Sequence, residues 1–464
     1  MKAKQIRGLL VIALSAVTTV AVAQAPNSSY FTEGFVYRHD MNPAFGNEQN
    51  YIAIPAIGSI NAKTMGNFGY EDVVRDNPLY PSQSSKKKTT FLNPYIDDPL
   101  SGFNSGWNRV GAQADIAVLS AGFKAFGGYN TVEINSRTTV NVKLPYEVLE
   151  FATNMGNDNY DIGDIYANGQ SFVELNFGHS HNIGKNWRVG AKLKFLFGIA
   201  DADVQMKDAK AYLTGDTWTI NADAQAHMSM KGFKYKSKQK EYKTESRGTY
   251  DHIDDVDVDG GGIGGFGMAV DLGAVYTMEN WQFSAALMDL GFISWSNDMY
   301  ATNREKTFTF DGFHDIGVHR DENPIDDPGK SYGDQLSDFY NLQDQGDQDS
   351  RTTGIGARMN FGVSYTLPKY DKLSFGLLSA TRFLGKHSWT EGRLSANWAP
   401  LKWLDGNVNV AVNTYTASFG WLVNVHPKGF NFFVGMDHLI GKVSNEMIPL
   451  SSNAALSLGF NVLF

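Results

Sequence analysis

Apolar and polar positions alternate with a period of two through most of the sequence, which is the pattern of β-strands. In residues 187–199, Leu193 and Phe195 fall on one face and Lys192 and Lys194 on the other. The same alternation occurs in residues 109–118, 265–276 and 407–413. Each segment is about ten residues long, the length that a tilted strand needs to cross a membrane. A soluble sheet with its polar face in water would alternate in the same way, so other features have to decide between the two.

The chain ends on one of these alternating segments. Five apolar residues share one of its faces, namely Leu456, Leu458, Phe460, Val462 and Phe464. A chain end normally frays into water unless it is tied down. Terminal strands of outer-membrane barrels carry this pattern with a final aromatic residue, which the barrel-assembly machinery recognises. We therefore interpret the five residues as an assembly signal, and we expect the last strand to pair with the first and close the barrel.

The start of the chain predicts export. Lys2, Lys4 and Arg7 precede an apolar run that ends on small residues, which is the arrangement of a cleaved signal peptide over residues 1–23. A membrane-anchoring helix is the alternative, but the run falls short of the ~20 apolar residues that a span needs. Since no linker or repeat divides the remainder, we predict a single domain over residues 24–464.

Composition narrows the class further. The chain has no cysteine, so it offers neither a lipoprotein anchor nor a disulfide. Its net charge of −9 argues against a nucleic acid as partner, because phosphate binding needs a concentrated basic face. No motif of nucleophilic, metal-dependent or phosphate-binding catalysis occurs, so enzymatic activity is not predicted. These features favour an all-β fold, an antiparallel transmembrane β-barrel in the bacterial outer membrane, in contact with lipid and lipopolysaccharide.

The connections between the alternating segments are of two kinds. Tight turns are predicted at residues 182–186, 277–280 and 426–429, whereas residues 319–350 form a long, acidic connection. Short turns on one rim and long extracellular loops on the other are typical of such barrels. Aromatic residues beside the turns predict a girdle at the lipid interface, namely Trp187, Trp281, Trp421 and Phe430. The one predicted helix, residues 145–155, is too short to span and would plug, cap or lie at the rim of the barrel.

Four stretches carry a family resemblance: GFGMAVDLGAVY (265–276), AALMDLGFISW (285–295), FTFDGF (308–313) and GWLVNVHPKGFNFFVGMDHLIGK (420–442). They resemble an uncharacterised family of Bacteroidetes outer-membrane barrels. That family is distantly related to the long-chain fatty-acid transporter barrels and to the barrels of the gliding-associated secretion system. The resemblance extends over most of the mature chain and implies a barrel of about fourteen strands. It carries over no catalytic or binding residue.

A metal site is one candidate for chemistry. In DVDVDG, Asp255, Asp257 and Asp259 match the first half of a calcium loop, and Gly260 would make its turn. The twelfth position, where a bidentate glutamate belongs, is Phe266. We therefore interpret the segment as an acidic extracellular loop, with calcium as the alternative and no other cofactor expected.

A basic strand is a second candidate. Lys234, Lys236, Lys238 and Lys240 fall on one face of a predicted strand. Above the outer leaflet these ammonium groups could bind lipopolysaccharide phosphates through charge-assisted contacts, although a solvated face explains them equally well.

Two functions are compatible with these expectations. Many inward positions are Gly, Ala, Ser or Asn with few charges, which predicts a narrow or plugged lumen. The first function is a gated channel or transporter for small apolar or amphipathic molecules, in which residues 145–155 act as the plug. The second is a non-enzymatic scaffold that presents acidic extracellular loops to a protein or glycan partner.

Overall fold

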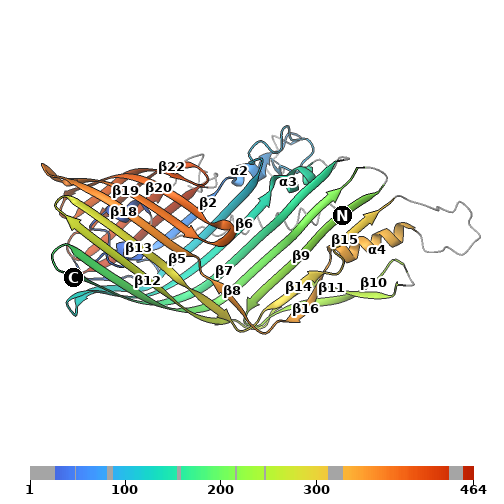
Figure 1. The fold of residues 1–464 in the computed structure, drawn as a ribbon, viewed down its shortest axis with the longest axis horizontal. Helices are drawn as coiled ribbons and strands as arrows, with labels where there is room; N and C mark the ends of the chain where they lie inside the picture. Colours follow the sequence, from blue (N-terminus) through green and yellow to red (C-terminus); the bar gives the residue numbers. More distant parts are fainter. Residues whose placement is uncertain are drawn as a thin grey trace, which may run out of the picture.

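The computed structural model is a closed antiparallel barrel of 14 strands, as the sequence predicts (Figure 1). It describes residues 27–47, 49–80, 87–153, 158–214, 217–244, 247–311, 328–437 and 453–464. The predicted signal peptide, residues 1–23, lies outside the described residues. The barrel strands are β1 (Tyr51–Ala53) and β2 (Ile60–Gly66), which share one position, then β5 (Trp107–Ala125), β6 (Gly128–Pro145), β7 (Asn159–Ile183), β8 (Trp187–Tyr212), β12 (Gly265–Met278), β13 (Trp281–Trp295), β17 (Arg351–Gly354) with β18 (Ala357–Leu367), β19 (Tyr370–Phe383), β20 (Trp389–Leu401), β21 (Leu404–Asn413), β22 (Ala417–Val425), β23 (Phe430–Asp437) and β24 (Ala454–Leu463).

Pairing of the last strand with the first closes the barrel. Ala53 of β1 pairs with Asn461 of β24, and Ile60 of β2 pairs with Leu458. Both β1 and β2 pair with β5 on their other side. The ladder therefore has no free edge in the wall, which is what a strand structure needs in lipid.

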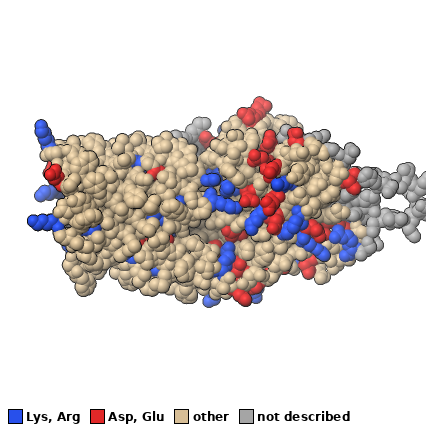
Figure 2. All heavy atoms as spheres, viewed as in Figure 1, with Lys and Arg blue, Asp and Glu red and all other residues tan. Residues whose placement is uncertain are grey.

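The outer surface of the barrel is an apolar belt. Leu193 is 37% exposed and points outward, whereas its neighbour Lys192 is 2% exposed and points inward. Outward positions elsewhere in the wall are also large and apolar, including Phe266, Leu272, Val408, Val410, Phe460 and Val462. Figure 2 shows the barrel half almost free of charge, whereas charged residues gather on the other half. The predicted faces of these strands are confirmed, and contact of this belt with lipid stays a prediction.

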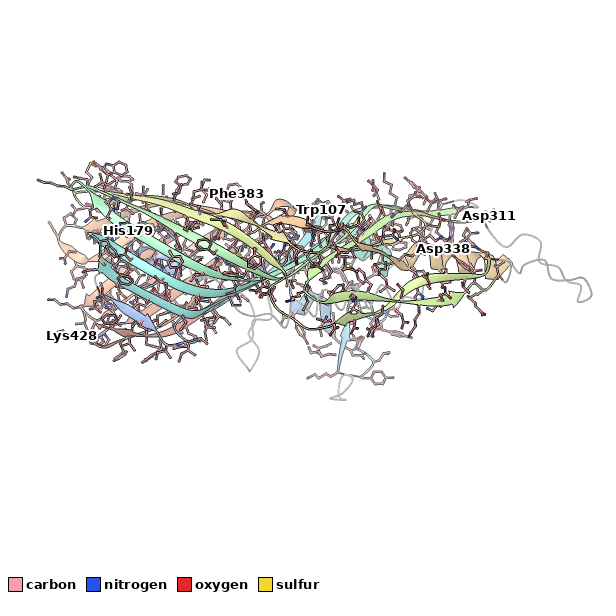
Figure 3. All side chains as sticks on the ribbon, turned by 90° about the horizontal axis from the view of Figure 1, so that it is seen from below. Trp107, His179, Asp311, Asp338, Phe383 and Lys428 are labelled. Atoms are coloured by element: carbon pink, nitrogen blue, oxygen red, sulfur yellow. The ribbon has the colours of Figure 1, made fainter. Side chains whose placement is uncertain are left out.

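The two rims differ as expected. One rim carries tight turns such as 184–186 and 279–280, and Figure 3 places His179 and Lys428 there. Aromatic rings flank these turns: the rings of Trp187 and Tyr276 lie 4.8 Å apart, and those of Phe430 and Phe460 lie 5.9 Å apart. Trp421 is an exception, because it lies in the middle of β22 opposite Val408 and Met436 rather than at the rim.

At the opposite rim the sheet continues well beyond the barrel. Strands β7 and β8 are 25 and 26 residues long, more than a membrane requires. Their ends carry an extension made of β9 (Trp218–Met230), β10 (Phe233–Glu241), β11 (Thr249–Val258), β14 (Met299–Asn303), β15 (Thr307–Phe310), β16 (Leu342–Asp347) and α4 (Pro328–Tyr340). A small rim layer, formed by α2 (Tyr70–Val73), β3 (Val74–Asp76), β4 (Lys88–Thr90) and α3 (Tyr146–Thr153), lies beside it.

The extension has its own apolar core and polar contacts. Phe68, Leu149, Tyr160 and Phe339 are buried in one cluster that joins the rim layer to α4. Burial and a 2.5 Å hydrogen bond to Asp338 raise the pKa of the Tyr242 hydroxyl to about 12. The extension is therefore a packed layer rather than a set of loose loops.

The predicted helix over 145–155 exists as α3. Of the three expected places, plug, cap and rim, it takes the rim: Val148 and Leu149 are buried in the rim cluster, so its expected role as the plug is wrong. Helix α4 lies within the long connection 319–350, which showed no apolar repeat that would predict it. No helix among the described residues is long and apolar enough to cross a membrane.

The orientation of the wall leads to the first prediction. Leu193→Arg should destabilise the barrel by about 2–4 kcal/mol, because it places a charge near the middle of the apolar belt. The heat-dependent mobility of the folded barrel on gels and its urea midpoint in detergent would measure the effect. Val256→Arg is the matched control, because Val256 is 50% exposed on β11, outside the barrel. Equal tolerance of both substitutions would contradict the assigned faces.

Candidate functional site

The lumen is filled near its turn rim by the N-terminal segment, residues 27–47, which we call the plug. It consists of two short 3-10 helices, η1 (Asn27–Phe31) and η2 (Arg38–Asp40), and the irregular chain around them. Its aromatic side chains are fully buried against each other and the wall; the rings of Phe35 and of Phe433 on β23 lie 4.8 Å apart. The plug is therefore seated by packing as firmly as an ordinary core.

Glycines in the wall make room for the plug. A Cβ at Gly376 would collide with the ring of Phe31, and one at Gly362 would collide with the ring of Tyr30. Gly190 and Gly273 lie in the same way against the backbone of Pro43 and the side chain of Asn42. The small inward residues of the sequence thus shape a fixed seat for one segment.

Hydrogen bonds from the wall satisfy the irregular backbone of the plug. Asn360 donates to the Met41 carbonyl (2.9 Å) and Asn407 to the Ser28 carbonyl (2.8 Å). In return, the backbone N–H of Gly34 donates to Asp405 (2.9 Å). A buried chain without regular secondary structure needs such partners, because each unpaired group costs about 1–3 kcal/mol.

An asparagine chain lines the wall beside the plug. Asn424 donates to Asp405 (2.7 Å), Asn431 donates to Asn424 (2.6 Å) and Asn461 donates to Asn431 (3.1 Å). The chain ends at the plug, where the Tyr37 hydroxyl donates to Asn461 (2.7 Å). The inward asparagines of the alternating strands are therefore part of the contact with the plug.

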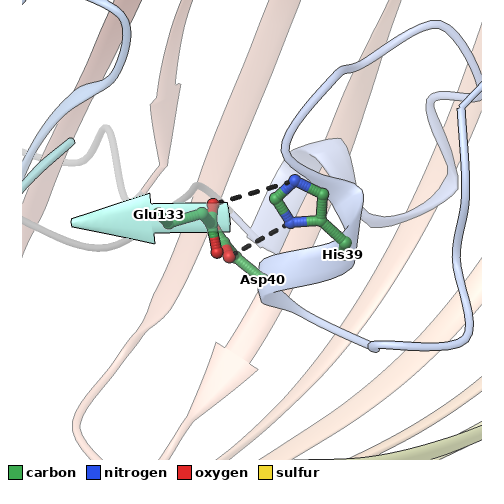
Figure 4. A group of neighbouring side chains, drawn as sticks. All are labelled: His39, Asp40 and Glu133. Atoms are coloured by element: carbon green, nitrogen blue, oxygen red, sulfur yellow. Dashed lines mark hydrogen bonds and ion pairs between the residues drawn. The ribbon is translucent and has the colours of Figure 1, made fainter. Parts of the chain in front are cut away.

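An ion pair joins the plug to the wall. Lys192 Nζ lies 2.7 Å from Asp40 Oδ1 on the plug and 2.7 Å from Glu133 Oε2 on β6. Figure 4 shows Asp40 and Glu133 with His39, whose ring nitrogens contact both carboxylates. The three side chains could in principle ligate a metal ion. Because the Lys192 ammonium already lies between the two carboxylates, we assign the group to plug binding rather than to a metal.

A second charged layer crosses the lumen above the plug. Asp289 accepts from Arg137 (3.0 Å), Lys194 (2.5 Å) and Arg358 (2.7 Å). A bulge between β12 and β13 turns Asp289 inward, where its backbone has a φ of 57°. The expectation of a lumen with few charges is therefore wrong. Buried charges are present, but they are paired with residues distant in sequence.

A cavity of about 330 Å³ lies between this layer and the rim that carries the extension. Polar residues of β6, β7 and β8 form one side, including Asn141, Tyr166 and Asp203. The end of β19 and the 3-10 helix η4 (Gly385–His387), which follows it, form the other. Its size is that of a small-molecule site.

The predicted calcium ligands lie away from this cavity. Asp255 and Asp257 belong to β11, where the backbone is extended and paired with β10, and Lys236 lies 3.2 Å from Asp257. An extended ladder cannot wrap round an ion as a calcium loop does. Asp259 follows the end of the strand and is exposed. The geometry thus gives no support to calcium at these residues.

The predicted lysine face exists on β10. All four side chains, Lys234, Lys236, Lys238 and Lys240, are exposed in the extension. Lys238 also pairs with Asp254. Binding of lipopolysaccharide phosphates by these residues stays a prediction.

The predicted assembly signal lies on the outer face of β24. Leu456, Phe460 and Val462 point outward, and Phe464 is exposed at the turn rim. This is the placement such a signal requires, and recognition by the assembly machinery stays a prediction.

The plug is the functional element that sequence reasoning missed. Its residues show neither a period of two nor one of 3.6, so no regular element is predicted there. The available signal was the concentration of aromatic residues among residues 30–45, just after the predicted cleavage site. Inward glycines in the strands were the matching signal on the wall.

Comparisons with known proteins identify a family and a general resemblance. The sequence model of a family of unknown function (DUF5723) matches residues 43–437. No protein of curated function matches the chain. Among solved structures, the Ralstonia pickettii toluene transporter TbuX is similar at 9% identity and a TM-score of 0.45, over 95% of this chain and 98% of that one.

Two further solved structures are similar to the same degree. The P. putida toluene transporter TodX matches at 8% identity and a TM-score of 0.41, over 97% of each chain. A Pseudomonas aeruginosa FadL homologue matches at 10% identity and a TM-score of 0.41, over 96% of this chain and 98% of that one. At these values the resemblance carries no argument about what this chain binds.

The ion pair between plug and wall leads to the second prediction. Lys192→Met should lower the free energy of unfolding by about 3–5 kcal/mol, because it leaves two buried carboxylates without their cation. The double variant Lys192→Met, Glu133→Gln should recover part of the loss. Urea titration in detergent, followed by tryptophan fluorescence, would measure both. Lys372→Met is the control, because Lys372 is exposed at the turn rim; a Lys192 variant as stable as this control would contradict the assignment.

Proposed function

The chain belongs to this family of unknown function, and we propose that it is a non-enzymatic outer-membrane barrel that passes a small amphipathic molecule through a lumen gated by its plug. The observation that carries the proposal is the seat of the plug: glycines, asparagines and one lysine of the wall are matched to residues 27–47. A barrel that served only as a rigid anchor would not need a separate segment fitted into its lumen.

The plug can leave without unfolding the wall. The strand ladder is complete in itself, and the plug contributes no strand to it. The plug is held by side-chain packing, by one ion pair and by individual hydrogen bonds, each worth about 0.5–1.5 kcal/mol net, and none of these contacts belongs to the strand ladder. Local opening is therefore less costly than global unfolding.

The charges of the wall also remain paired when the plug moves. Lys192 binds both the plug and Glu133, so losing Asp40 leaves it with the carboxylate of the wall. Asp405 similarly keeps Asn424 after losing the backbone of Gly34. These charged side chains of the wall would therefore keep a polar partner when the plug leaves the lumen, which is expected of a wall whose plug acts as a gate.

The lining of the cavity favours an amphipathic molecule over a purely apolar one. Phe383, Leu384 and Ile355 offer apolar contact, but Asn168, Gln170 and Arg382 face the same space. Each of these groups has one partner in the wall, and an apolar ligand would exclude water from their remaining hydrogen-bonding atoms, which is unfavourable.

A scaffold function is the second candidate, and the extension supports it. The β10–β11 hairpin stands beyond the barrel with exposed lysines and aspartates on its surface (Figures 1 and 2). Such a surface could bind a protein or glycan. A scaffold of this kind would not require that the lumen ever open.

The third prediction separates the two functions. Gly376→Leu should displace Phe31 from its seat and raise the ion conductance of the purified barrel in planar bilayers, whereas the intact protein should conduct little. Gly392→Leu is the matched control, because a Cβ at that position of β20 meets nothing within 4 Å. Deletion of residues 146–153 should not raise conductance, because α3 lies outside the lumen.

Two results would contradict the gate. Large, steady conductance of the intact protein would indicate an open porin. Equal, low conductance of the Gly376 and Gly392 variants would favour the scaffold function, provided that heat-dependent mobility on gels shows both variants to be folded.

A further inference from the structure

The 330 Å³ cavity adjoins a smaller, more basic pocket. Thr139, Asn141, Arg382 and Leu384 line both spaces. The smaller pocket adds Lys63, His387 and the rings of Trp389 and Tyr415, and no acidic residue lines it. We call the two spaces together the chamber.

Two cations of the chamber have no carboxylate partner among the described residues. Lys63 Nζ lies 4.3 Å from the ring centre of Trp389, and Arg382 donates to the amide oxygen of Gln113. The third cation of the lining, Lys386, lies 3.2 Å from Asp164 Oδ2. The two acids of the lining, Asp201 and Asp203, are fewer than its three cations, so the net charge of the lining is positive.

Two buried nitrogen atoms in the chamber have no hydrogen-bond partner. They are Nε of Arg382, which is 5% exposed, and Nε2 of His387, which is 4% exposed. A buried donor left unpaired is costly, and more so on a charged group. Both residues line the chamber, so each brings unused hydrogen-bonding capacity to its wall.

His387 lies buried among cations. Burial is the main cause that lowers the pKa of its imidazole to about 4, and the nearby charges of Arg109, Lys143 and Lys386 act in the same direction. The imidazole ring is held in place by Tyr166, whose ring centre lies 5.2 Å away. A neutral imidazole among cations can donate a hydrogen bond to an anion.

We propose that the chamber binds a small organic anion, with a carboxylate on Arg382 and His387 and a short, flat apolar body against Trp389 and Tyr415. This inference rests on the proposed function, since it names the class of amphipathic molecule that the barrel passes. A guanidinium is well suited to a carboxylate, because its N–H groups match the carboxylate oxygens in geometry and charge. The apolar lining is too limited for a long chain, so the body is short.

Three probes that differ only in the polar group test the proposal. They are 4-phenylbutyrate, 4-phenylbutan-1-ol and 4-phenylbutylamine, titrated calorimetrically into the full-length protein in a neutral detergent at pH 7. The carboxylate should bind about tenfold or more tightly than the alcohol, since a hydrogen bond to a charged group is worth that much, and the amine should bind weakest.

Variants assign the effect to the chamber. Arg382→Gln should weaken binding of the carboxylate about tenfold or more and leave the alcohol unchanged. His387→Gln should weaken it less, and it lies in η4 outside the barrel strands, so it tests the site even if the Arg382 variant fails to fold. Lys372→Gln, at the turn rim, is the control with the same loss of charge.

The results of these titrations and of the conductance measurements distinguish failure of the anion site from failure of the gated barrel. Equal affinity for acid and alcohol, tightest binding of the amine, or indifference to both variants would overturn the anion site. If that happens while Gly376→Leu still raises conductance, the gated barrel stands and only the class of ligand is wrong. If conductance does not rise either, both proposals fall.

Discussion

Pairing of the polar groups that the wall turns inward is the constraint on which this structure depends. A barrel in lipid satisfies its backbone by closure, but its inner face still has to be matched by water, by its own side chains or by another segment. Here the plug supplies part of the match: Asn360 and Asn407 donate to its carbonyls, and Asp405 accepts from its backbone. The outward side chains of the strands are therefore apolar, as lipid requires, and inward polar side chains near the plug are matched to its backbone.

The contents of the lumen form successive layers from the turn rim outward. The plug comes first and is held by Lys192, followed by the paired charges around Asp289 and then by Arg382, which reaches across to Gln113. The chamber lies above them. In the proposed function, a molecule that passes from the chamber displaces polar contacts one layer at a time, which suits an amphipathic ligand better than a hydrocarbon.

The outer half of the architecture was predictable because lipid imposes a simple rule. Val408 and Val410 face outward while Asn407 and Asn409 face inward, as the period of two requires. The closure of β24 on β1 and β2 follows from the same pattern. The period of two was sufficient to predict the outward face of the strands, because all outward positions of the belt share one apolar environment.

The inner half could not be read in the same way, because its partners are distant in sequence. Asp289 and Arg137 are separated by 152 positions, so neither residue reveals that it belongs to a charged layer. Helix α3 was predicted, but its apolar face alone did not decide between the lumen and the rim cluster, in which it packs. The chamber depends on η4 folding back toward β6 and β7, which a three-residue turn does not signal.

Hydrogen exchange of the plug in lipid nanodiscs tests the central claim most directly. Peptides covering residues 27–47 should be strongly protected in the intact protein, because their backbone groups are bonded and buried in the lumen. In the Lys192→Met variant the same peptides should exchange faster while the barrel strands remain protected. Exchange of the plug at the rate of an exposed loop in the intact protein would show that the lumen is not closed by this segment, and would contradict the account.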